Sequence, residues 1–279
     1  MTIRIGCDPE LFAIDINTKK AVSVHDLIPG DKLLPYPVPH GAIQVDGTAA
    51  EFNIDPAENH VDFIRNIKRV SGVLELALKA KNANLILVAQ PSVVFDKEYF
   101  EELPWMAKEL GCEPDYNAYT GQANKKPDGD ATTMRTGSGH IHIGWTSVED
   151  KYDKEHFEKC CSLVKELDAT LNDVSICWDT DTKRQELYGK PGAFRPKTYG
   201  LEYRVLSNAW LNSEDTMKYV FDTAYYTTMR WLEGVSCRAV INQNSKYPRE
   251  RFNFALRAAG IPCIEDYLGE GVISYVRYA

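Results

Sequence analysis

The chain has 279 residues, of which 44% are hydrophobic and 26% are charged, and its formal net charge is −8 at pH 7. These values are ordinary for a globular protein and leave ample material for a buried core. Non-specific nucleic-acid binding depends on cationic side chains that neutralise phosphates, so an acidic chain is a poor candidate for it. We therefore expect no nucleic-acid partner.

The sequence shows no membrane-spanning or secretory segment. No apolar run is long enough to cross a bilayer, and residues 1–12 lack the basic and apolar regions of a signal peptide. The seven cysteines are scattered and none forms a CxxC pair, which argues against a disulfide framework or a zinc knuckle. We expect reduced thiols, no membrane partner and a cytoplasmic location, which is the host cytoplasm if a phage encodes the chain.

The first quarter of the chain predicts strands followed by a helix. Residues 3–15 indicate a strand interrupted at Pro9, and residues 42–54 indicate a hairpin around the turn signal VDGTA. Residues 55–83 have apolar positions at helical spacing. Asp55 as N-cap, Pro56 at the first helical position and Glu58 two residues later predict a capping box that starts this helix.

The remaining elements follow the same local signals. A strand broken at Pro91 is expected within residues 85–95, and loops are expected at 112–135 and 178–200. Strands are predicted at 139–144 and 201–207, and helices at 154–173, 213–235 and 248–260, of which the last is closed by Gly260. Strands and helices do not alternate regularly, which favours an α+β fold with a mostly antiparallel sheet. We expect one domain over 1–279, with 212–279 as its helical C-terminal part.

Four predicted strands carry polar residues at alternate positions. Side chains two apart in a strand share one face, so each pair lies on the face opposite its apolar neighbours. The pairs are Asp8 and Glu10, Glu51 and Asn53, His140 and His142, and Glu202 and Arg204. A solvated sheet face is the simplest reading of any one pair. Carboxylates with two imidazoles and no thiolate favour a hard divalent cation over structural zinc.

The four polar pairs and the residues around them, taken in chain order, resemble the motifs of the carboxylate–amine ligases of the glutamine synthetase superfamily. The similarity is to the phage-type carboxylate–amine ligase type 2 family in particular, and the glutamate–cysteine ligase type 2 family shares the same ordered pattern. The motifs are the acidic strands GCDPELFAID and DGTAAEFNIDPAEN, the strand TGSGHIHIG and the strand YGLEYRVLSNAW. The stretches GCEPDYNAYTG and RQELYGKPGAFRPKTYG also resemble the phage-type group. The similarity covers roughly residues 3 to 212.

The resemblance implies a fold and a set of ligands. It implies a curved, mostly antiparallel sheet of the glutamine synthetase catalytic-domain type, with helices on the convex face and with ATP and Mg²⁺ (or Mn²⁺) in the concave face. The implied metal ligands are Asp8, Glu10, Glu51, His140 and Glu202. Glutamine synthetases often carry two glutamates where this chain has Asp8 and Glu10, which leaves the number of metal ions open.

The resemblance also assigns roles around the phosphates. Arg204 stands where a cation would hold the transferring phosphoryl group, and Glu51 and Glu202 act beside it as catalytic residues. His142 would contact a phosphate or support the metal ligands. The candidates for nucleotide or substrate contacts are Arg184, Lys190, Arg195 and Lys197. Asp46 and Asp115 are candidates for the base that deprotonates the amine, and each also fits the role of a turn residue.

The implied activity is an ATP-dependent carboxylate–amine ligase that forms an amide or peptide bond through an acyl phosphate. Its partners would be a small-molecule or peptide carboxylate and an amine. Superfamily members often assemble, so a homo-oligomer is compatible with this reading. We expect Glu202→Gln or Arg204→Ala to abolish activity with little loss of stability.

Two other functions remain open. One is a metal-dependent hydrolase or oxygenase that uses His140, His142 and a carboxylate as a facial triad. The other is a non-catalytic, nucleotide-binding relative that keeps the fold.

Overall fold

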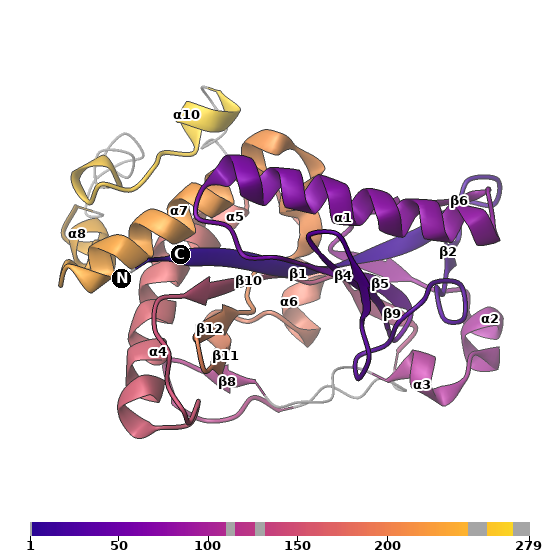
Figure 1. Ribbon diagram of the computed structural model, residues 1–279, viewed down its shortest axis with the longest axis horizontal. Helices are drawn as coiled ribbons and strands as arrows, with labels where there is room; N and C mark the ends of the chain where they lie inside the picture. The colour runs from indigo at the N-terminus through magenta and orange to yellow at the C-terminus, as the bar shows by residue number, and fades with distance from the viewer. Residues whose placement is uncertain (1, 110–114, 126–131, 245–255, 270–279) are drawn as a thin grey trace.

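The computed structural model describes residues 2–109, 115–125, 132–244 and 256–269. These residues form an α+β fold around a ten-stranded open sheet with the order β3-β4-β5-β1-β10-β12-β11-β8, in which β2 and β6 also pair with β1 (Figure 1). The strands β7 and β9 form a separate two-stranded sheet. Every pairing among the named strands is antiparallel, as predicted.

The strands are β1 Arg4–Asp15, β2 Ala21–Val22, β3 Tyr36–Val38, β4 Gly41–Asp46, β5 Ala49–Ile54, β6 Leu85–Val88, β7 Ser92–Val94, β8 Tyr116–Asn117, β9 Met134–Thr136, β10 Gly139–Gly144, β11 Ala193–Lys197 and β12 Gly200–Tyr203. The helices are α1 His60–Lys81, α2 Lys97–Glu102, α3 Trp105–Lys108, α4 Lys154–Leu167, α5 Asp173–Ser175, α6 Thr182–Leu187, α7 Glu214–Leu232, α8 Cys237–Asn244 and α10 Glu265–Leu268. A π-helical turn, Asp168–Asn172, continues α4, and a 3₁₀ helix, Asn208–Asn212, precedes α7.

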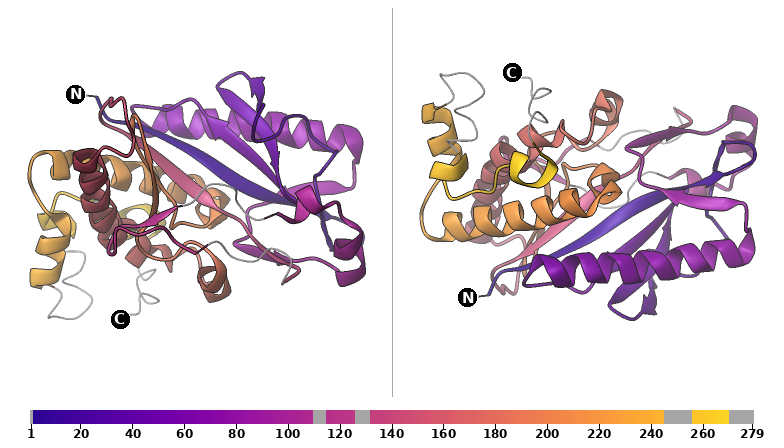
Figure 2. Two further views of the ribbon diagram at one scale, coloured as in Figure 1. Left: turned by 90° about the horizontal axis from the view of Figure 1, so that it is seen from below. Right: turned by 90° about the horizontal axis from the view of Figure 1, so that it is seen from above.

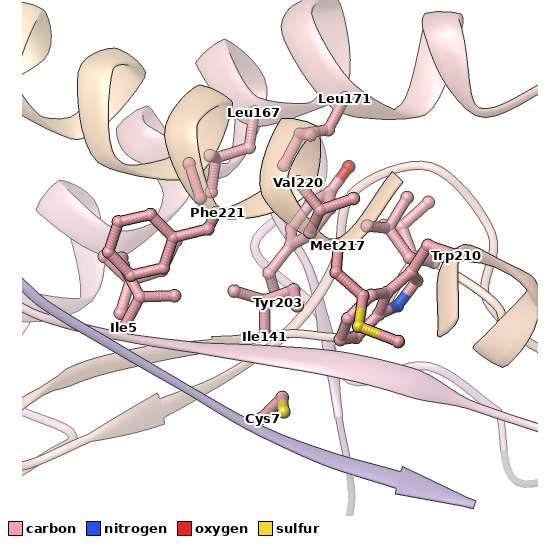
Figure 3. Close-up of a cluster of buried hydrophobic side chains, with 14 of the residues drawn as sticks. Ile5, Cys7, Ile141, Leu167, Leu171, Tyr203, Trp210, Met217, Val220 and Phe221 are labelled. Carbon is pink, nitrogen blue, oxygen red and sulfur yellow. The ribbon is translucent and has the colours of Figure 1, made fainter. Parts of the chain in front are cut away.

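One face of the sheet is apolar and carries the core. Residues opposite each other in antiparallel strands project to the same side, and Cys7 lies opposite Ile141, which lies opposite Tyr203. All three are almost completely buried. Figure 3 shows them packed with Trp210 and Phe221 from the 3₁₀ helix and α7. The alternation of apolar residues along the strands therefore marks the core face correctly.

Three long helices cover this apolar face. Helix α1 packs against β4, β5 and β6, while α4 packs against β11 and β12. Helix α7 contacts β1 and lies staggered beside α1, as the view from above shows (Figure 2). Because these three helices occupy one face, the other face of the sheet is left for the polar residues of the alternating pattern. We call it the polar face.

Pro9 does not interrupt the first strand, contrary to the prediction. The strand β1 runs through it without a break. The amide of Glu10 donates to the Ser138 carbonyl (2.8 Å), on the side of β10. Backbone N–H groups alternate sides along a strand, so the proline nitrogen faces β5, which pairs with β1 only at Glu10 and Leu11. The missing donor therefore falls where no partner strand requires it.

The predicted start of the first helix was wrong. Asn59 is the N-cap of α1, and its side chain accepts from the amide of Asp62. Residues 55–58 stay outside the helix because Ala57 exchanges two backbone hydrogen bonds with Ile5 (2.8 and 2.9 Å). Glu58 pairs with Arg4 instead of closing a capping box. Tertiary pairing with β1 outweighs the local capping signal here.

The other predicted helix and strand boundaries were partly confirmed. Ser213 is the N-cap of α7, as predicted. The expected loop at 178–200 contains α6 and the strand β11, which was missed because Pro196 lies within it. The predicted helix at 248–260 lies mostly outside the described residues. Within the described ranges, no helix has the length and apolarity needed to cross a bilayer. That residues 1–279 form a single domain remains a prediction.

Candidate functional site

The polar face brings most of the predicted site residues into two adjacent clusters. The histidine cluster consists of Asp8, His140, His142 and Glu202, from β1, β10 and β12. The acidic cluster consists of Glu10, Asp46 and Glu51, from β1, β4 and β5. In each cluster, three side chains offer ligand atoms that all lie within 4.8 Å of one another: Asp8, His142 and Glu202 in the first, and Glu10, Asp46 and Glu51 in the second.

Register positions the histidine cluster. Asp8 lies opposite His140, and His142 lies opposite Glu202. The Asp8 carboxylate faces both imidazoles, with Oδ2 3.0 Å from His142 Nε2 and Oδ1 3.4 Å from His140 Nδ1. The same His140 nitrogen is 3.5 Å from Oε1 of Glu202. The two carboxylates and two imidazoles thus converge on one point of the polar face.

Three cations surround Glu202, which is completely buried. Lys197 Nζ lies 2.8 Å from Oε2, and Arg195 Nη1 lies 3.3 Å from the same oxygen. Arg204 contacts Oε1, and its guanidinium also reaches the hydroxyl of Tyr188. One carboxylate therefore collects three positive charges, which are more than it can neutralise.

Charge coupling sets the protonation of the histidine cluster. Burial alone would raise the pKa of Asp8, but His142 and then His140 outweigh it and hold that pKa well below its usual range. Burial would lower the pKa of His142, but Asp8 raises it overall. Burial, aided by Arg204, lowers the pKa of His140 to about 4. His140 is therefore a neutral imidazole at pH 7, which is the form that binds a metal.

The acidic cluster has the opposite balance. Glu10 lies opposite Glu51 at the junction of β1 and β5, and Asp46 ends β4 beside them. Lys32 forms an ion pair with Asp46 (2.6 Å), and the Ser138 amide donates to Glu10 Oε2 (3.0 Å). Three carboxylates thus share one point of the sheet with one lysine beside them.

This crowding shifts the pKa values of the acidic cluster upward. Burial, followed by the charge of Asp46, raises the pKa of Glu10 to about 7. The same two causes raise the pKa of Glu51 well above its ordinary value. A divalent cation would remove the repulsion that produces these shifts.

A cavity of about 620 Å³ adjoins the clusters, and its lining includes Asp8, His142 and Glu51. Gly6 and Gly144 occupy polar-face positions without side chains, which leaves the sheet bare there. The rest of the lining mixes apolar and polar residues, among them Ile54, Pro56, Trp145, Arg4 and Asn53. The cavity has the size of a small-molecule site.

The donors of both clusters fit a hard divalent cation. Carboxylate oxygens and a neutral imidazole are ligands for Mg²⁺ or Mn²⁺. The Asp8 Oδ1 atom is buried, and among the described residues it makes no hydrogen bond. Asp8, His140, His142 and Glu202 would hold one ion, while Glu10, Glu51 and Asp46 would hold another. Asp46 was predicted only as a base or a turn residue.

Two predicted contact residues lie outside these clusters. Arg184 is buried and donates to the backbone carbonyls of Gly137, Val205 and Leu206 at 2.7 to 3.2 Å. Its guanidinium therefore holds neighbouring loops together. Lys190 is exposed in the turn before β11. The remaining base candidate, Asp115, has Oδ2 3.6 Å from Arg204 Nε.

Three site residues carried no signal in the sequence. Lys32 lies in a loop rich in proline and glycine, and it reaches Asp46 only because the chain folds back. Tyr188 contacts Arg204 and His140, and Tyr199 contacts His142. Both tyrosines lie in the segment predicted as a loop, where no periodic pattern assigns a direction to a side chain.

Comparison with known proteins adds no family to this description. A scan against protein-family models finds no match, and a search of curated proteins finds no significant relative. The resemblance to carboxylate–amine ligases therefore rests on the ordered motifs.

Proposed function

We propose that this protein is an ATP-dependent carboxylate–amine ligase that uses Mg²⁺ or Mn²⁺ and forms an amide or peptide bond through an acyl phosphate. The observation that carries the proposal is the meeting of metal-ligand carboxylates with three cations on the polar face, beside a cavity that Asp8, His142 and Glu51 help to line. A carboxylate does not condense with an amine at neutral pH, because oxide is a poor leaving group. Phosphorylation by ATP supplies a good one.

The charge count supports a polyphosphate ligand. Asp8, Glu202 and Asp115 bring three negative charges, and Arg195, Lys197 and Arg204 bring three positive charges. A divalent cation at this point would make the local charge positive. A multiply charged anion would balance it, and the phosphates of a nucleotide have the required charge.

The arrangement suggests roles for these side chains. Arg204, held by Glu202 and the Tyr188 hydroxyl, would donate to the phosphoryl group as it transfers. Lys197 and Arg195 would neutralise neighbouring phosphate oxygens. Metal ions held by the histidine cluster and the acidic cluster would neutralise the charge that develops on the phosphate. The adjoining cavity of about 620 Å³ would accommodate the nucleoside.

The proposal extends to the fold. A glutamine synthetase-type catalytic domain has a curved sheet with helices on the convex face and ligands in the concave face. The one-sided helical layer and the polar face opposite it are compatible with that arrangement. The cytoplasmic location and the carboxylate and amine partners follow from the same proposal.

The alternative of a facial-triad hydrolase or oxygenase is supported by His140 and His142, whose imidazoles both face the carboxylate of Asp8. A facial triad assigns no role to the three cations beside it, whereas a polyphosphate ligand would engage them. This alternative requires no nucleotide. Nucleotide binding therefore separates the two functions.

The proposal is tested by incubating the protein with ATP, Mg²⁺, hydroxylamine and a panel of amino acids and peptide acids. Hydroxylamine traps an acyl phosphate as a hydroxamate, and phosphate release reports turnover. We expect hydroxamate with at least one acid, and a loss of about 10³-fold with Arg204→Lys. The control variant is Glu149→Gln, which removes an exposed carboxylate and should leave turnover unchanged.

The outcomes separate the candidate functions. Binding of Mg²⁺–ATP without turnover of any acid would favour the non-catalytic relative. A thermal shift with Fe²⁺ or Zn²⁺ but none with Mg²⁺–ATP would favour the facial-triad enzyme and would exclude the ligase.

A further inference from the structure

The turn between β11 and β12 carries two groups of the site. Lys197 pairs with Glu202 at 2.8 Å, and Tyr199 contacts the Nδ1 atom of His142 through its hydroxyl. The turn is also tied to the segment after β10, because the Tyr199 carbonyl accepts from the amides of Trp145 and Thr146 at 3.0 and 3.2 Å. The conformation of residues 197–200 therefore fixes how these two side chains meet the histidine cluster.

His156 holds this turn from the helical layer. It lies in the first turn of α4 and is almost completely buried. Figure 1 shows α4 beside β11 and β12. The Nε2 atom is 2.9 Å from the Lys197 carbonyl and 3.2 Å from the Gly200 carbonyl. Carbonyl oxygens only accept, so this nitrogen carries the proton and bridges both ends of the turn.

Two neighbours fix the imidazole in this position. Its ring stacks on Trp145 at a centroid distance of 6.0 Å and an angle of 27°. Cys160 Sγ, one helical turn further along α4, also lies 3.5 Å from the Gly200 carbonyl. The side chain of Asp153 accepts from the backbone amide of His156 and caps the helix at this end. The helix thus presents a rigid donor to the turn.

We propose that His156 is a positioning residue for the nucleotide end of the site. It acts through the turn, by keeping Lys197 and Tyr199 directed at Glu202 and His142, and it touches no substrate itself. The inference rests on the proposed function in placing phosphates beside Lys197. Its structural part stands on the hydrogen bonds alone.

The test compares His156→Gln with His156→Met. Both side chains are unbranched and similar in length, but only glutamine keeps a terminal N–H donor. We expect amide hydrogen exchange at Trp145, Thr146 and Val148 to be about tenfold faster in the methionine variant, and Mn²⁺ binding, measured by electron paramagnetic resonance, to be about tenfold weaker. The glutamine variant should remain close to the wild type in both measurements.

A matched control separates positioning from general stability. Val164→Ala removes buried volume from the same helix at a residue that is fully buried. It should lower the melting temperature while leaving exchange at residues 145–148 and Mn²⁺ affinity unchanged. Equal effects from Val164→Ala and His156→Met would overturn the proposal, because the loss would then reflect destabilisation of α4.

Two further measurements complete the test. Long-range ¹H–¹⁵N spectra of the wild type should show the Nε2–H tautomer of His156, and an Nδ1–H tautomer would sink the idea. In Tyr199→Phe, which removes the hydroxyl that contacts His142, the added change His156→Met should have little further effect on Mn²⁺ affinity, whereas additive losses would contradict action through Tyr199. If the wild type binds no Mn²⁺, the proposed metal site fails, and the exchange and tautomer data still decide the role of His156.

Discussion

Replacement of Glu10 by glutamine should stabilise the metal-free protein at neutral and alkaline pH. Glu10 shares the acidic cluster with Asp46 and Glu51, and burial with the charge of Asp46 raises its pKa from 4.5 to about 7. A raised carboxyl pKa favours the protonated folded state, so its stabilising contribution is complete below pH 4.5 and is lost as the pH rises through about 7. The shift corresponds to at most about 3 kcal/mol of unfolding free energy.

The variant removes this charge with little change in shape. A glutamine oxygen can still accept from the Ser138 amide that Glu10 Oε2 binds at 3.0 Å. We therefore expect Glu10→Gln to unfold at higher denaturant concentration than the wild type at pH 8, and to differ from it little at pH 4.5. The same variant should bind Mn²⁺ more weakly, because an anionic ligand is lost.

The assay is urea unfolding in the presence of EDTA at several pH values between 4.5 and 8. Glu149→Gln serves as the control, because it removes an exposed carboxylate and should follow the wild type at every pH. A Glu10→Gln variant that is less stable than the wild type at pH 8, or that keeps the same pH dependence, would refute the reasoning. Such a result would mean that other groups in the folded protein already neutralise Glu10.

Three further predictions concern the histidine cluster. Glu202→Gln should lower the unfolding free energy of the metal-free protein by about 3 kcal/mol or more, because three cations lose a buried anionic partner. A loss of unfolding free energy below about 1 kcal/mol in urea unfolding would contradict this expectation. Asp8→Asn should lower the pKa of His142 relative to the wild type, because burial continues to lower that pKa and Glu202 alone offsets less of it than Glu202 and Asp8 together; an NMR titration that shows an unchanged pKa would be inconsistent with the Asp8 contact. Arg204→Lys should reduce hydroxamate formation while retaining Mn²⁺ binding, and a parallel loss of both would indicate that Arg204 orders the metal ligands instead.

The burial of Glu202 changes one expectation drawn from the sequence. Alternation in the strand places Glu202 and Arg204 on the polar face and predicts that their loss affects activity with little effect on stability. The structure buries Glu202 completely and gives it three cationic partners. Burial of a polar face depends on what the loops add above it, and a strand pattern carries no information about those loops.

The glycines before the paired histidines are a second case in which the sequence does not reveal what packs against a segment. The segment Gly137–Ser138–Gly139 has the composition of a flexible lead-in, yet a Cβ at Gly139 would lie 2.3 Å from the Ser207 carbonyl oxygen. Glycine is required there because the segment before the 3₁₀ helix crosses the strand at close range, and Trp210 donates to the Gly139 carbonyl (3.1 Å). A sequence shows the small residue but not the chain that approaches it.

The sequence by itself determined which residues share the polar face, because a strand alternates its side chains whatever lies beside it. It predicted Asp8, Glu10, Glu51, His140, His142 and Glu202 as neighbours of one site. Only the tertiary structure decided their grouping. Positions two apart along a strand are separated by roughly 6.6 Å, whereas cross-strand neighbours lie about 5 Å apart. Strand order therefore joins Asp8 to the histidines, and Glu10 to Glu51 and Asp46, as two separate clusters.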